Sequence, residues 1–137
     1  MEQRDTFLKE FRGGTIGNVS LQSSFDELFQ NDILRTILKL QNDLFIVAFI
    51  NYVNQNKIDF NLYSIEKKRT LIENVIQKDI KFRNTLKGMI IGLFTVEEYK
   101  KYIQNSSSIN KRMIGLIIER LKSQVSLFES FFMESSK

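Results

Sequence analysis

Residues 64–94 read SIEKKRTLIENVIQKDIKFRNTLKGMIIGLF, and this stretch decides the fold class. If it is wound into one helix of 3.6 residues per turn, its large apolar side chains fall within a wedge about 100° wide. They are Leu71, Ile72, Val75, Phe82, Leu86, Met89, Ile90 and Leu93. Such a wedge is typical of a helix that packs one side against a core. The stretch therefore predicts a long amphipathic helix that begins at Ser64 and ends near Phe94.

One charged residue interrupts this wedge. Asp79 lies among the apolar positions, where a carboxylate is unfavourable. Aspartate is a good N-cap and a poor residue for a helix interior, because its side chain bonds to nearby backbone amides. We therefore expect the helix to break near residues 78–81, with Asp79 capping the second half.

The preceding segment predicts another long helix, from Ser24 to about Gln55. Ser24 and Glu27 have the spacing of a capping box. The stripe of this helix consists of Ile33, Ile37, Leu40 and Leu44. Residues 44–50 are apolar on all sides, which indicates burial on every side, either in the centre of a bundle or in an oligomer interface.

Two further helices follow, which completes an all-α prediction. Thr95 and Glu98 form a second capping box, which opens a short helix that ends near Gln104. Residues 105–108 predict a turn, and the last helix is expected from Ile109 to about Met133. The chain has no proline, which suits long helices. We expect one domain over residues 23–137, a helical bundle of four or five helices.

Residues 1–22 are predicted to form a partly flexible N-terminal arm. Phe7, Leu8 and Phe11 are spaced for one helical turn, and Gly13, Gly14 and Gly17 then interrupt the pattern. No lysine followed by serine or threonine ends this glycine cluster, so it does not have the pattern of a phosphate-binding loop.

Four residue types are absent, and their absence limits the chemistry. The chain has no Cys, His, Trp or Pro. Without Cys and His there is no disulfide, no thiolate nucleophile, no Ser-His-Asp triad and no common zinc or haem ligand. We therefore expect no cofactor, no metal site and no enzyme. The longest apolar run has seven residues, well below the roughly 20 of a membrane span, and the charged N-terminus does not resemble a secretory signal, so we expect a cytoplasmic protein.

The aromatic content points to protein–protein interaction. The 137 residues include 12 Phe and 4 Tyr. Aromatic side chains dominate interface energetics, and those near the chain ends have few neighbours to cover them. The candidate anchors are Phe7, Phe11, Phe45, Phe49, Phe128, Phe131 and Phe132. Core burial is the simpler explanation for Phe45 and Phe49. The leading hypothesis is an adaptor or regulatory module that binds another protein, and self-associates, through apolar helix faces.

The charge distribution supports an alternative. Residues 64–122 contain 13 Lys and Arg against 6 Asp and Glu, although the chain as a whole has a net charge of +4. A basic segment can attract an acidic protein or a phosphate backbone. The candidate nucleic-acid contacts are Lys67, Lys68, Arg69, Lys78, Lys81, Arg83, Lys87, Lys111 and Arg112. Residues 96–112 also have the outline of a helix-turn-helix. Cations that border a buried stripe are the more common explanation.

Three glycines lie inside predicted helices, at Gly88, Gly92 and Gly115. A helical glycine costs up to about 1 kcal/mol relative to alanine, so it usually has a packing reason. We favour a close helix crossing over the alternative, which is a small slot for a ligand or a partner helix.

Overall fold

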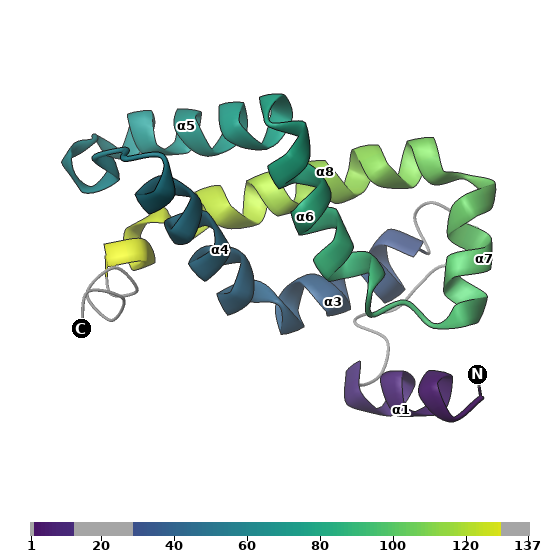
Figure 1. The fold of residues 1–137 in the computed structure, drawn as a ribbon. Coiled ribbons are helices and arrows are strands. Elements are labelled where there is room, and N and C mark those ends of the chain that lie inside the picture. The colour runs from purple at the N-terminus through teal and green to yellow at the C-terminus, as the bar shows by residue number, and fades with distance from the viewer. Residues whose placement is uncertain (1, 13–28, 130–137) are drawn as a thin grey trace.

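The computed structural model describes residues 2–12 and 29–129, and within them it contains seven α-helices and no β-strand (Figure 1). The α-helices are α1 (Glu2–Arg12), α3 (Arg35–Leu40), α4 (Asn42–Gln55), α5 (Ile65–Lys78), α6 (Ile80–Ile91), α7 (Val96–Gln104) and α8 (Ser106–Ser123). Three short turns of other helix types are η1 (Gln30–Leu34), η2 (Phe60–Leu62) and η3 (Val125–Leu127). The all-α class is confirmed. The expected number of four or five helices is wrong, because the long helices are divided and residues 2–12 form a helix of their own.

The predicted break at Asp79 is confirmed. Ser64 caps α5 by accepting a hydrogen bond from the Lys67 amide, and Asp79 caps α6 by accepting one from the Phe82 amide at 3.0 Å. The second oxygen of Asp79 accepts a hydrogen bond from the Tyr52 hydroxyl at 2.9 Å. The carboxylate that interrupts the apolar wedge is therefore satisfied by a backbone amide and a side chain of α4.

The predicted helix over residues 24–55 is divided at Gln41, and the part before residue 29 lies outside the described residues. Gln41 ends α3, and its side-chain amide donates to the Met89 carbonyl of α6 at 2.9 Å. Leu40 and Leu44, which the stripe places in the core, are exposed on either side of this break. Val47 is also exposed, so the expectation that residues 44–50 are buried on every side is wrong.

The capping box at Thr95 is confirmed and opens α7. The next helix begins earlier than expected, at Ser106, and ends at Ser123, before η3. The turn between α7 and α8 is thus the single residue Asn105, shorter than the three to four residues typical of a helix-turn-helix. The expected end of this helix at Met133 lies outside the described residues.

The core is organised around the ring of Phe49 on α4. Its centroid lies 5.6 Å from that of Phe60, 6.3 Å from Phe82 and 5.9 Å from Phe128. Phe128 thus packs into the core, where it joins the end of the described chain to α4 and η2. Phe45, Phe49 and Phe128 are fully buried, so these three are wrong as candidate anchors for a partner.

The helical glycines do not mark a helix crossing. A methyl group added at Gly88 or Gly115 would meet no atom within 4 Å, and one at Gly92 would meet only the Gly88 carbonyl oxygen at 3.1 Å. No neighbouring helix approaches them in the described part of the chain, so the close-crossing interpretation is wrong.

Candidate functional site

Helix α1 docks at the junction between α6 and α7, where backbone groups need partners. The last carbonyls of a helix lack partners within it and carry partial negative charge, so cations are favoured there. Arg4 donates to the carbonyls of Phe94 at 2.8 Å and Gly92 at 3.0 Å, and Arg12 donates to that of Leu93 at 3.0 Å. Two arginines of α1 therefore satisfy the carbonyls that follow α6.

The start of α7 has the opposite need, because its first amides lack acceptors. The Asp5 carboxylate of α1 accepts a hydrogen bond from the Val96 amide at 2.9 Å. A carboxylate at a helix N-terminus is also favoured by the helix dipole. The arginines of α1 therefore complement the end of α6, and its aspartate complements the start of α7.

The strongest contact of α1 is an ion pair between Arg12 and Glu98. The guanidinium donates to both carboxylate oxygens, at 2.6 and 2.7 Å, and the two side chains are only 7% and 13% exposed. Glu98 also accepts from the Thr95 amide at 2.8 Å, as part of the capping box. Burial raises the pKa of Glu98, but the hydrogen bonds and charge of Arg12 and the bonds to Thr95 outweigh it, so the pKa lies below its ordinary value.

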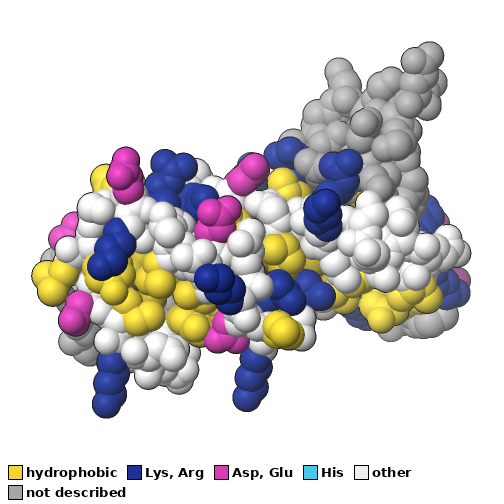
Figure 2. All heavy atoms as spheres, turned by 90° about the horizontal axis from the view of Figure 1, so that it is seen from above, with side chains coloured by type: hydrophobic (Ala, Val, Ile, Leu, Met, Phe, Trp, Pro, Cys, Tyr) yellow, Lys and Arg dark blue, Asp and Glu magenta, His cyan; other side chains and the backbone are white. Residues whose placement is uncertain are grey.

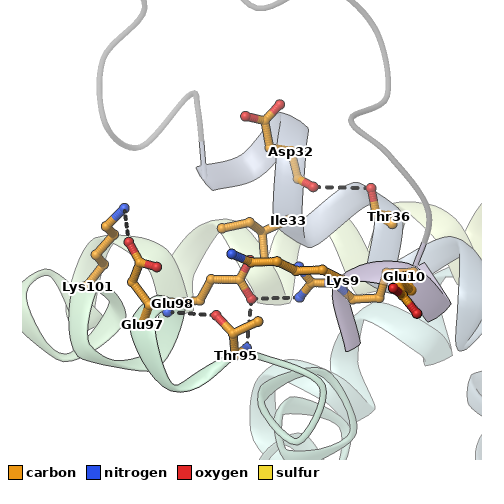
Figure 3. Close-up of a pocket in the computed structure, with 10 residues that line it drawn as sticks. Lys9, Glu10, Asp32, Ile33, Thr36, Thr95, Glu97, Glu98 and Lys101 are labelled. Atoms are coloured by element: carbon orange, nitrogen blue, oxygen red, sulfur yellow. Dashed lines mark hydrogen bonds and ion pairs between the residues drawn. The ribbon is translucent and has the colours of Figure 1, made fainter. Parts of the chain in front are cut away.

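A cavity of about 580 Å³ lies beside this ion pair, and residues of α1, η1, α3 and α7 line it (Figure 3). Four of its charged groups form two ion pairs, whereas a buried carboxylate oxygen of Asp32 has no hydrogen-bond partner among the described residues. Arg12 holds Glu98, and Lys101 lies 3.6 Å from Glu97. The Asp32 carboxylate points away from Glu98. Because the ion pair between Arg12 of α1 and Glu98 of α7 lines the cavity, it lies where α1 contacts the rest of the described chain.

Helix α1 also exposes two aromatic side chains. Leu8 is buried, whereas Phe7 and Phe11 are 62% and 56% exposed. Their rings stack on each other with centroids 5.8 Å apart and 10° between the planes. We call these two residues the α1 aromatic pair. It gives α1 an exposed apolar surface beside its docked side, because Phe7 and Phe11 lie three and seven residues after Arg4 and so share a helical stripe with it.

A second exposed apolar surface lies on α3 and α4. Leu44 and Val47 are exposed and three residues apart, which places them on one side of α4, and Leu40 is exposed at the end of α3. We call these three residues the α4 stripe. Helix α1 contacts α3, and both helices lie along the lower edge of the molecule in Figure 1. Helix α1 is therefore a neighbour of the helix that carries Leu40, whereas Leu44 and Val47 lie on the next helix, α4.

The candidate nucleic-acid contacts are only partly brought together. Arg83, Lys87 and Lys111 line one groove, between α6 and α8. The other six cations do not line it. Among these, Lys67 lies over the ring of Tyr63, with its ammonium nitrogen 4.0 Å from the centroid, and that of Lys68 lies 5.5 Å from the centroid of Phe60. On the face viewed in Figure 2, Lys and Arg side chains alternate with Asp, Glu and hydrophobic side chains.

Sequence reasoning identified one part of this site and missed another. Phe7 and Phe11 are exposed, as an anchor for a partner must be, and Phe131 and Phe132 lie outside the described residues. The docking contacts of α1 were missed. Glu98 is explained by its capping box alone, and nothing in the local sequence indicates that Arg12 pairs with a residue 86 positions away.

Comparison with known proteins gives no relative: no family model, curated protein or solved structure matches the chain. In the part of the chain that the structure describes, no helix is long and apolar enough to cross a membrane. Nor do three or more carboxylates gather there as a metal site would require.

Proposed function

We propose that this protein is a non-catalytic interaction module that self-associates through the α1 aromatic pair and the α4 stripe. The observation that carries the proposal is the exposure of the stacked rings of Phe7 and Phe11 on a helix that charged contacts hold at the junction of α6 and α7. Aromatic side chains that pack as rigid anchors supply much of the binding energy at protein interfaces.

A second copy of the chain is the partner that fits these surfaces. One copy carries both a pair of exposed rings on α1 and an apolar stripe that begins on α3, the helix that α1 contacts, and continues on α4. In a two-fold dimer, the same patch faces itself, so the rings of each copy can cover the stripe of the other. The contact is therefore made twice, and both exposed apolar surfaces are removed from water.

The experiment is sedimentation velocity over a range of concentrations. We expect the wild type to dimerise and two double variants, Phe7→Ser with Phe11→Ser and Leu44→Ser with Val47→Ser, to be monomeric. Leu62→Ser is the matched control, because Leu62 is 83% exposed but belongs to neither surface. It should dimerise like the wild type.

Mixing the two double variants tests the pairing itself. Each variant alone loses both contacts of the dimer, whereas the mixed pair retains one intact contact, between the rings of one variant and the stripe of the other. We therefore expect weak association in the mixture and none in either variant alone. The proposal is contradicted if the wild type is monomeric at every concentration. It is also contradicted if both double variants dimerise as strongly as the wild type.

A further inference from the structure

Three cations and no described carboxylate line the groove between α6 and α8. Its volume is about 490 Å³, within the range of small-molecule sites. Arg83 and Lys87 reach it from α6, and Lys111 reaches it from α8. None of the three forms an ion pair with a described carboxylate, and no described carboxylate lines the groove. Like charges placed this close repel one another, so the arrangement favours an anion that carries more than one charge.

Three further lining residues belong to α8, and we call them the floor of the groove: two are isoleucines and one is a glycine that packing does not explain. Ile114, Gly115 and Ile118 line it from within α8. A methyl group at Gly115 would meet no atom within 4 Å, so no neighbouring side chain requires the glycine. Glycine inside a helix is unfavourable, and here its effect is to leave open space at the floor. A flat apolar group has room to lie there.

Two amide side chains complete the lining, those of Gln77 and Asn110. The oxygen of Asn110 accepts a hydrogen bond from the Tyr102 hydroxyl, which fixes the amide and leaves its NH₂ group to donate elsewhere. Arg83 donates to the Gln77 carbonyl at 2.8 Å, which fixes its guanidinium at the end of α5. Polar groups held in this way can recognise the edge of a planar ligand.

We propose that this groove binds a nucleotide unit. Its phosphate would be held by Arg83, Lys87 and Lys111, and its base would lie on the floor over Gly115 within reach of Asn110. The site is separate from the surfaces assigned to self-association. A free nucleotide and a nucleotide within a single strand share this chemistry.

Calorimetric titration of the full chain with AMP, adenosine and inorganic phosphate tests the assignment. We expect AMP to bind, and each of the other two to bind about tenfold more weakly or worse, because each supplies only part of the contact. Lys111→Ala should lower the affinity for AMP about tenfold, since it removes a charge-assisted contact. Lys100→Ala, on the exposed side of α7, removes the same charge and should leave the affinity unchanged.

Gly115 provides the sharper test, because stability and binding should move in opposite directions. Gly115→Ala should raise the melting temperature, because alanine favours the helix, and should weaken AMP binding by filling the floor. Gly88→Ala is the matched control: its added methyl also meets nothing, but Gly88 does not line the groove. It should raise the melting temperature and leave the affinity unchanged.

A short oligo(A) strand separates the two sources of the nucleotide. Binding that is tighter than that of AMP and falls steeply with salt assigns the site to a strand, and equal binding assigns it to a free nucleotide. The proposal is overturned if AMP does not bind, if phosphate binds as tightly as AMP, or if Gly115→Ala leaves the affinity unchanged. The same titration is repeated with the double variant Phe7→Ser and Phe11→Ser, which is expected to be monomeric. Its AMP affinity should equal that of the wild type, so the result for the groove does not depend on self-association.

Discussion

At the scale of single residues, the pair of Arg12 and Glu98 is the contact with the largest expected effect. Both side chains are almost fully buried, and Glu98 also accepts from the Thr95 amide. A buried charge that loses its partner keeps its desolvation cost without compensation. The pair therefore holds α1 in place more firmly than its small apolar contact through Leu8 would.

Glu98→Ala is expected to lower the free energy of unfolding by about 3 kcal/mol, because it leaves the Arg12 guanidinium buried without its carboxylate. Urea denaturation measures the change. Glu97→Ala is the control next to it in sequence, since the Glu97 carboxylate pairs with Lys101 at the surface and both side chains are more than half exposed. The control should change stability by less than about 1 kcal/mol. Equal losses of unfolding free energy in the two variants would show that the buried Arg12 guanidinium does not need the Glu98 carboxylate as its partner.

At the scale of helices, polar side chains connect the break between α3 and α4 to other elements. The side-chain oxygen of Asn42 accepts hydrogen bonds from Arg120, at 2.7 Å, and from Gln124. Gln41 reaches α6 on the other side. These bonds tie the start of α4 to two other elements, which explains why a helix-forming sequence is interrupted there.

We predict that Asn42→Ala destabilises the protein by about 1–3 kcal/mol, because it leaves the partly buried donors of Arg120 and Gln124 without this acceptor. Thermal or urea unfolding measures the loss. Asn51→Ala changes an exposed residue of the same helix and should stay within about 0.5 kcal/mol of the wild type. If Asn51→Ala lowers the free energy of unfolding as much as Asn42→Ala does, the hydrogen bonds of Asn42 do not contribute to stability as proposed.

At the scale of the whole molecule, three titrating groups shape how stability depends on pH. Hydrogen bonds from the Phe82 amide and the Tyr52 hydroxyl hold the pKa of Asp79 below its ordinary value, and that of Glu98 is also lowered. Burial, followed by the bond to Asp79, raises the pKa of Tyr52. Lowered carboxyl pKa values stabilise the fold above their ordinary values of 3.8 and 4.5, and this contribution is lost as the pH falls. A raised tyrosine pKa stabilises the fold below 10.0, and that contribution is lost as the pH rises through the folded value.

The free energy of unfolding should therefore have a plateau at intermediate pH and fall at both ends. Denaturant titrations at a series of pH values measure it. Glu98→Gln should make the acid decline shallower, because one of the two protonating groups is gone. Tyr52→Phe should make the alkaline decline shallower while keeping the ring contact with Phe82, whose centroid is 4.6 Å away. Variants that follow the wild-type curve in shape would refute this assignment of the titrating groups.

Local sequence alone determined the helical class and several helix ends. The caps at Ser64, Asp79 and Thr95 act through backbone amides three residues away, so their spacing in the chain is sufficient to predict them. The apolar wedge of residues 64–94 is likewise local, because helical periodicity fixes which side chains share a face.

Only the tertiary structure decided where α1 docks, where α3 ends and which apolar residues remain exposed. Arg12 and Glu98, or Asn42 and Gln124, are more than 80 residues apart in sequence, and no local periodicity connects them. Phe49 and Phe7 are the same residue type, yet one is fully buried and the other 62% exposed, because burial depends on which elements pack together. The groove beneath Arg83, Lys87 and Lys111 is decided in the same way, since α6 and α8 supply its cations from separate parts of the chain.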